Sequence, residues 1–289
     1  MQVHFAMQEG MMLTPLAVVP MNNWFTIDSR VVRIWMRRFG IGVSLLVAIA
    51  LSYLLLLCFP EPLFCAEAQR HHIYVYSDQP LPPAINVLLK EVERRLAASP
   101  LYRAEQIHRV FLCQSPRRFA FFTNVNAGAG GVTYVYFNRS IFLRPARIAA
   151  NRLLAPSGQE VPGNRTLVYF ITHELTHDLT ISHLGARAYS RLPEWVREGY
   201  ADYVAQGDTF NFRLAREQFL RGAPAMDPAR SGLYLRYHLL VAYLLDIKGI
   251  SVDALLTQPF NVRQLETEIR HLTLPPERGG WQRNAGEAV

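Results

Sequence analysis

The longest uncharged stretch of the chain restricts its fold more than any other feature. It runs from Phe39 to Phe59, covers 21 residues and is rich in Leu, Val and Ile. A helix needs about 20 apolar residues to cross the roughly 30 Å hydrocarbon core of a bilayer. We therefore expect residues 39–59 to form one membrane-spanning helix, with the rest of the chain folded outside that segment.

Charged residues on either side of the apolar stretch predict its direction. Four arginines precede it and two glutamates follow it, namely Arg30, Arg33, Arg37, Arg38, Glu61 and Glu67. Positive charge favours the cytoplasmic side of a membrane. We expect a single-pass protein with a short cytoplasmic segment at residues 1–38 and everything after residue 60 outside the cytoplasm.

A cleaved signal sequence is the alternative interpretation of this stretch. Its length exceeds the 7 to 15 apolar residues usual in signal peptides, which favours a retained anchor. The triplet Ala66-Glu67-Ala68, however, matches a small-residue cleavage site. Cleavage there would release a secreted protein.

The remaining chain changes from strand-like to helix-like patterns along its length. Alternating or β-branched segments predict strands at 72–77 and 109–113 and one or two strands within 132–143. Apolar residues at helical spacing predict helices at 83–98, 164–184, 193–205, 211–220, 233–248 and 262–272, and the pattern is helical from residue 145 onward. We expect an α+β domain over residues 69–274, with a small mixed sheet followed by a helical half, and a disordered tail at 275–289.

The net charge of +7 gives little information about partners. Nearly all of it comes from arginine, because the chain has only two lysines, Lys90 and Lys248. The arginines are scattered, and no segment interleaves aromatic and basic residues as nucleic-acid-binding modules do. We therefore expect no nucleic-acid partner.

One helical segment contains a pattern of metal ligands. His173-Glu174-Leu175-Thr176-His177 is an HExxH sequence, in which two histidines four residues apart lie on one face of a helix. Both imidazoles can reach the same metal ion. Glu174 lies on an adjoining part of that surface, where its carboxylate can reach a metal-bound water, which is the position of a general base.

A second helix offers further groups of the right kind. Catalytic zinc takes three protein ligands and keeps a fourth position open. Downstream, Glu198 and Asp202 are four residues apart and share one face of the predicted helix at 193–205. Glu198 can complete the zinc site, and Asp202 can accept the ring N–H of one histidine and orient it.

Residues 166–205 resemble the gluzincin branch of zinc metallopeptidases, the thermolysin-like and peptidase MA-like families, in which HExxH is followed by a glutamate ligand on the next helix. The resemblance implies a zincin-like fold and one zinc ion per chain, bound by His173, His177 and Glu198. It implies that Glu174 activates the water and that Asp202 supports a histidine. It also implies that a strand at 132–137 borders the substrate cleft, where it could pair with an extended peptide.

His183 is a rival third ligand, because its spacing from His173 is that of the metzincin branch. Those proteins break the helix with a glycine at the position of Thr180, and a β-branched residue resists the positive φ of such a turn. If the helix continues, His183 lies about 9 Å beyond His177 and roughly 80° off the face of His173. This geometry favours Glu198.

The expected chemistry is hydrolysis by a zinc-activated water. Zinc lowers the pKa of its water towards neutrality, Glu174 accepts the proton, and one further donor stabilises the oxyanion. In the families resembled, that donor is a tyrosine or histidine from a later helix or loop. Tyr234, Tyr237 and His238 are candidates, and we choose Tyr234.

These features predict a zinc metallopeptidase acting on a peptide or protein outside the cytoplasm. Two alternatives use the same residues: a zinc hydrolase with another substrate, and a non-catalytic zinc domain that binds a partner. Glu174 favours an enzyme, since a purely structural zinc site does not need that carboxylate.

Overall fold

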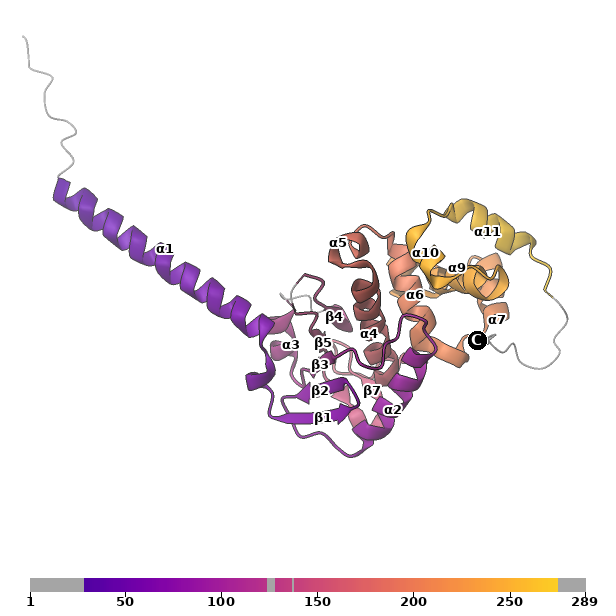
Figure 1. Ribbon diagram of the computed structural model, residues 1–289, viewed down its shortest axis with the longest axis horizontal. Coiled ribbons are helices and arrows are strands. Elements are labelled where there is room, and N and C mark those ends of the chain that lie inside the picture. The colour runs from indigo at the N-terminus through magenta and orange to yellow at the C-terminus, as the bar shows by residue number, and fades with distance from the viewer. Residues whose placement is uncertain (1–28, 124–127, 137, 275–289) are drawn as a thin grey trace, which may run out of the picture. The chain divides into compact units, whose positions relative to one another are not determined.

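The computed structural model describes residues 29–123, 128–136 and 138–274, which form two units (Figure 1). One unit ends at Tyr53 and the other runs from Leu54 onward. Residues 1–28 of the expected cytoplasmic segment at 1–38, the expected tail at 275–289, and Phe137 in an expected strand lie outside the described residues.

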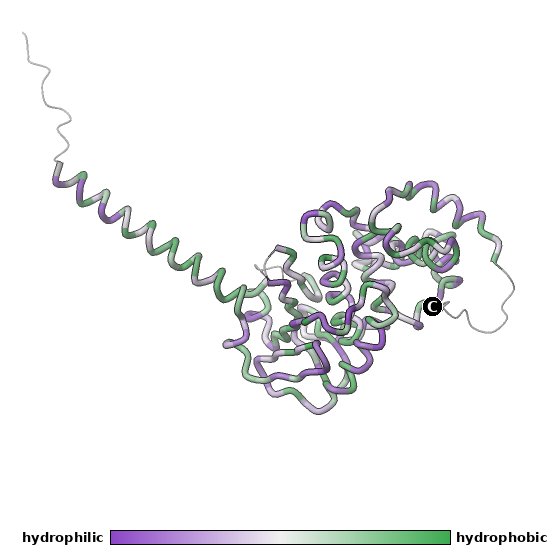
Figure 2. Tube along the Cα trace, in the orientation of Figure 1, coloured by the Kyte–Doolittle hydropathy of each residue, from purple (hydrophilic) through white to green (hydrophobic). Residues whose placement is uncertain are grey.

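The first unit consists of the apolar helix α1 (Ser29–Cys58) up to Tyr53. Its segment from Val32 to Cys58 is long and apolar enough to cross a membrane, and few of its side chains are buried in protein. The hydropathy colouring is predominantly apolar along this helix (Figure 2). The helix begins about ten residues before the expected span, because the arginine-rich residues ahead of Phe39 are helical as well.

The second unit contains a five-stranded mixed sheet. Its strands are β1 (Ala66–Arg70), β2 (Ile73–Ser77), β3 (His108–Leu112), β4 (Gly131–Thr133) and β5 (Ile141–Leu143). They lie in the order β1-β2-β3-β5-β4. The pairs β2/β3 and β3/β5 are parallel, whereas β1 and β4 are antiparallel to their neighbours and form the two edges.

Helices connect the parallel strands and then make up the C-terminal half. The helices of at least six residues in this unit are α2 (Ala84–Ala97), α3 (Pro116–Phe122), α4 (Leu167–Leu184), α6 (Glu194–Gln206), α7 (Phe212–Leu220), α9 (Leu235–Ala242), α10 (Val252–Thr257) and α11 (Val262–His271). The short helices α5 (Ala186–Tyr189) and α8 (Pro228–Ser231) lie between them. The α+β class and the mixed sheet are as expected, with helix predominating.

Helix α4 is the centre of this unit. It packs against β4, α2 and α6, and α6 in turn packs against α9 (Figure 1). Every residue from Leu167 to Ile181 is buried, so the helix has no solvent-facing side over four turns. Polar groups on α4 therefore need partners inside the protein.

Two expectations for the helical half are wrong in detail. Residues after 145 were expected to be helical, but β6 (Ala146–Arg147) pairs with β7 (Arg152–Leu153) before α4 begins. Pro145 and Pro156 flank this short ribbon and disfavour a continuous helix there. The single helix expected at 233–248 is α9 followed by a π-helical turn at Tyr243–Ile247.

The end of α1 is built into the second unit. Leu57 is buried, and the Asn138 side-chain amide donates to the carbonyl of Cys58. The ring of Phe64 packs against Phe111 at 5.0 Å and Phe122 at 5.6 Å between centroids. The chain therefore joins the folded domain within a few residues of the apolar helix.

Candidate metal centre

Helix α4 presents two histidines towards one point. The helix starts at the cap Thr166, whose side chain accepts from the backbone N–H of Tyr169, and it continues without a break to Leu184. His173 and His177 are therefore one turn apart on the same face. Their Nε2 atoms lie 3.2 Å from each other.

Helix α6 brings a carboxylate to the same point. Glu198 Oε2 lies 3.3 Å from His173 Nε2 and 3.6 Å from His177 Nε2. Ligand atoms bound to a tetrahedral ion at about 2.0–2.1 Å lie about 3.3–3.4 Å apart. The three donor atoms thus have the spacing of three corners of a zinc site, and His173, His177 and Glu198 could hold a metal ion.

The electrostatics of the group favour an ionised Glu198. Burial alone would raise the pKa of this carboxyl, but the charge and hydrogen bonds of His177 and His173 hold it well below its usual range. Burial would lower the pKa of His173, and Glu198 beside it raises that pKa above its ordinary value. A cation bound between these side chains would meet two imidazoles and the negative charge of the Glu198 carboxylate.

Glu174 lies beside the ligand group without joining it. Its buried side chain is directed to the edge strand β4, where Thr133 Oγ1 donates to Glu174 Oε2 at 2.6 Å. The three converging ligand atoms belong to other residues. Glu174 therefore contributes no atom to the ligand group, and its predicted role as a general base stays a prediction.

One tyrosine contacts the outer nitrogen of His177. The hydroxyl of Tyr189, the last residue of α5, lies 3.0 Å from His177 Nδ1. When Nε2 holds a metal, Nδ1 carries the proton, so this hydroxyl accepts the hydrogen bond and fixes the ring. Tyr189 was not among the residues predicted from the sequence, because the chain turns at Gly185 after α4 and helical spacing does not extend across that turn.

Tyr234 is the tyrosine chosen from sequence as an oxyanion donor. Its ring stacks on His173, with 5.8 Å between centroids and 9° between planes. Burial raises the pKa of Tyr234, and the charges of Glu198 and Glu174 raise it further, so the hydroxyl keeps its proton. Tyr237 stacks on the far side of Tyr234, at 6.1 Å between centroids.

Asp202 and His238 have a role different from those expected. Asp202 Oδ2 lies 2.7 Å from His238 Nδ1, and its other oxygen accepts from the hydroxyl of Tyr169. His238 therefore ties α9 to α6 inside the core. Asp202 shares a face of α6 with Glu198. Where α6 crosses α4, however, Asp202 meets Tyr169, which lies one turn before His173. Its partners are therefore not the rings of His173 or His177.

The rival ligand His183 lies away from the group. Helix α4 continues through Thr180, whose Oγ1 donates to the carbonyl of Thr176 at 2.8 Å. His183 Nε2 is 3.0 Å from Asp253 Oδ1 on α10. The group that could hold a metal therefore includes Glu198 and not His183.

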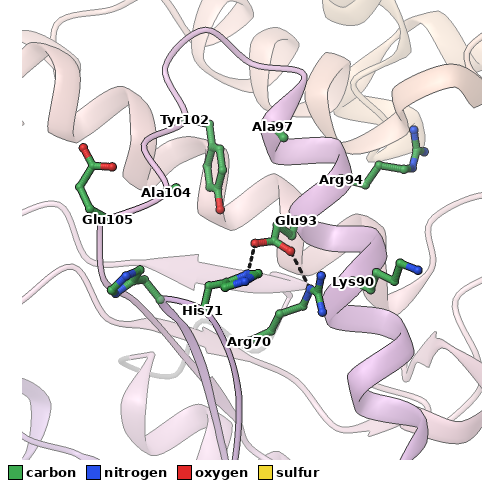
Figure 3. Close-up of a pocket in the computed structure, with 10 residues that line it drawn as sticks. Arg70, His71, Lys90, Glu93, Arg94, Ala97, Tyr102, Ala104 and Glu105 are labelled. Atoms are coloured by element: carbon green, nitrogen blue, oxygen red, sulfur yellow. Dashed lines mark hydrogen bonds and ion pairs between the residues drawn. The ribbon is translucent and has the colours of Figure 1, made fainter.

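A hollow elsewhere on the unit has a different character. It has a volume of about 590 Å³ and lies between β1, the turn after it and α2 (Figure 3). Glu93 lies at its centre, 2.6 Å from Arg70 and 2.5 Å from His71. Its central carboxylate is thus already neutralised by the side chains drawn around it, and none of the three converging ligands lines it.

Comparison with known proteins adds no relative to these observations. No protein family model matches the chain, and no curated protein is significantly similar to it. The function of the protein is therefore inferred from the geometry of the site.

Proposed function

We propose that this protein is a zinc-dependent metallopeptidase of the gluzincin type with a zincin-like domain. The convergence of His173, His177 and Glu198 at 3.2 to 3.6 Å carries the proposal. Closed structural zinc sites take four protein ligands, whereas the group formed by the described residues has three. The missing fourth ligand supports a catalytic site over a structural one.

The residues around the ligands supply the remaining parts of the hydrolytic reaction. Bound zinc would polarise a water and the substrate carbonyl. Glu174 takes the proton of the attacking water and passes it to the leaving amine. Tyr234 keeps its phenolic proton at neutral pH and donates to the oxyanion.

The edge strand favours a peptide as the substrate. Strand β4 has β5 as its single neighbour in the sheet, and its residue Thr133 touches the proposed base. An extended peptide can add to such an edge through main-chain hydrogen bonds, which would place a peptide bond near Glu174.

We further propose that α1 is retained as a membrane anchor, with the zinc domain outside the cytoplasm. Cleavage within Ala66-Glu67-Ala68 would divide strand β1, which pairs with β2 along its whole length. It would also remove Leu57 and Phe64, whose side chains are buried in the domain. Sequencing the N-terminus of the protein from its native membrane tests this: a start near Gln69 would contradict it.

The decisive experiment measures zinc content and hydrolysis of an unstructured protein by the full chain in detergent. Wild type should bind one zinc ion and cleave. Glu174→Gln should keep the zinc and lose at least about 100-fold in kcat, since the proton acceptor is gone. Glu217→Gln, an exposed position on α7, is the matched control and should behave as wild type.

Two other outcomes would contradict the proposal. A wild-type protein that binds no zinc would remove the metal site altogether. If the zinc-loaded protein cleaves no peptide bond, the proposed zinc site stands but the proposed peptidase activity is wrong.

A further inference from the structure

Strand β4 approaches helix α4 closely where the proposed base lies. Gly130 lies directly before the strand, and a Cβ atom on it would lie 2.4 Å from Cε1 of Phe170 on α4, whereas one on Gly131 would lie 2.8 Å from Cγ of Glu174 on α4. Contacts below 3.0 Å do not occur without movement of the neighbour. The pair of glycines is therefore what allows the strand to lie on the helix at this point.

The same strand contacts the carboxylate of Glu174 from two positions. A Cβ on Gly131 would lie 2.8 Å from both Cγ and Oε1 of Glu174, so the bare Cα of Gly131 packs against this side chain. Thr133 lies two residues further on and hence on the same face of the strand. Its Oγ1 is 2.6 Å from Glu174 Oε2.

The register of the sheet fixes both contacts. Gly131 pairs with Leu143 and Thr133 with Ile141, and both of these β5 partners are buried in the core that includes α4. Thr133 therefore cannot move to the other face of the sheet without disrupting the packing of these apolar side chains. Glu174 Oε1 has no hydrogen-bond partner among the described residues, so one oxygen is held by the strand and the other is left for water.

We propose that Thr133 is the positioning residue for Glu174, and that Gly131 gives the carboxylate the space in which Thr133 holds it. This inference rests on the proposed function of Glu174 as the base. The hydrogen bonds of the Thr133 hydroxyl are to Glu174, and none to the three ligands is present among the described residues. Its loss should therefore change the step that uses Glu174 while zinc binding is kept.

The test compares Thr133→Val with Thr133→Ser in the zinc-loaded full chain. Valine keeps the shape of the side chain without the hydroxyl, and serine keeps the hydroxyl. The control is Thr123→Val, which removes another buried threonine hydroxyl, one that donates to the carbonyl of Phe119 and not to Glu174.

Two quantities are measured, and one of them needs no turnover. Acetohydroxamate binds zinc as an anion and gives its proton to a neighbouring base, so its Kd reports on the placement of Glu174. Thr133→Val should weaken acetohydroxamate about tenfold or more and lower kcat about 10- to 100-fold, with KM within about twofold. Thr133→Ser should stay within about threefold of wild type in both, and Thr123→Val should match wild type.

The outcomes separate this inference from the function on which it rests. If Glu174→Gln weakens acetohydroxamate and Thr133→Val does not, Thr133 does not position the base, while the base itself stands. The same conclusion follows if serine fails to restore what valine loses. If zinc-loaded wild type does not bind acetohydroxamate, the metal has no open position, and both proposals are wrong.

Discussion

The two sides of helix α4 carry buried histidine–carboxylate groups of different geometry. On the side of the sheet, His108 Nδ1 and Asp178 Oδ2 form a pair at 2.7 Å. On the side of α6, His173 and His177 share one oxygen of Glu198 through their Nε2 atoms, at 3.3 and 3.6 Å. One side is a closed pair, and the other is a group of three with longer separations.

This difference separates a histidine paired with one carboxylate from histidines whose group could hold a metal ion. In a pair at 2.7 Å the ring N–H donates to a single carboxylate oxygen, and no space for an ion remains between the two groups. Three donors about 3.3 Å apart surround a point at about 2.0 Å from each, where an ion fits. The pair of Asp202 with His238, at 2.7 Å, belongs with His108 and Asp178 as structural.

The largest expected effect comes from removing the shared carboxylate. Glu198→Ala should weaken zinc roughly a thousandfold, well beyond the 10- to 100-fold loss typical of an outer partner of a ligand. His183→Ala, in the rival position, should leave zinc affinity within about twofold, because His183 contacts Asp253 instead. Competition with a chelator of known affinity measures both.

A reversed order of these two variants would overturn the assignment of ligands. Equally small losses of zinc affinity in both variants would mean that the group of three is not a metal site. It would then not differ in function from the His108–Asp178 pair.

The next largest effect is a loss of folding stability when the Asp202–His238 pair is broken. Asp202→Asn leaves His238 buried against a neutral amide and should cost about 3–5 kcal/mol of unfolding free energy. In a domain of this size, that corresponds to a fall in Tm of roughly 10 °C. Zinc affinity should stay within about threefold, since Asp202 contacts none of the ligands. Asp208→Asn, an exposed position, is the control.

The dependence of this effect on pH has a definite sign. Burial would raise the pKa of Asp202, but hydrogen bonds and charge from His238 lower it below its ordinary value of 3.8. A depressed pKa contributes stability that is present above the unfolded-state value and is lost as pH falls through the folded-state value. The difference in Tm between wild type and Asp202→Asn should therefore be full near pH 7 and shrink below about pH 4. If the difference in Tm between wild type and Asp202→Asn grew as the pH fell, the Asp202–His238 pair would not be the source of this stability.

The sequence predicts which side chains converge better than it predicts their hydrogen-bond partners, and the reason is physical. Spacing along a helix decides which residues share a face, and this is enough to bring together His173, His177 and Glu198. It does not decide how two helices cross. Asp202 lies on the face of Glu198 as expected, yet the packing of α6 against α4 and α9 gives it Tyr169 and His238 as partners.

The same limit applies to the fold. The long periodic helices α4, α6 and α11 lie within three residues of their predicted bounds. Strand β1 was not predicted, because Ala66–Arg70 has no β-branched or aromatic residue and is a strand through its pairing with β2. The short helix α3 was not predicted either, although its cap Ser115 followed by Pro116 is a helix-start signal in the sequence.

The smallest effect tests how the group of three is held in place. Tyr189→Phe removes the hydroxyl that lies 3.0 Å from His177 Nδ1 while the ring still fills its buried position. The ligand is then free to rotate and its Nδ1 proton has no acceptor, so zinc affinity should fall about 10- to 100-fold. His173 offers the internal comparison, because its own Nδ1 has no partner within the described part of the chain. If Tyr189→Phe binds zinc as wild type does, the contact at His177 is packing alone, and stacking between rings suffices to orient both ligands.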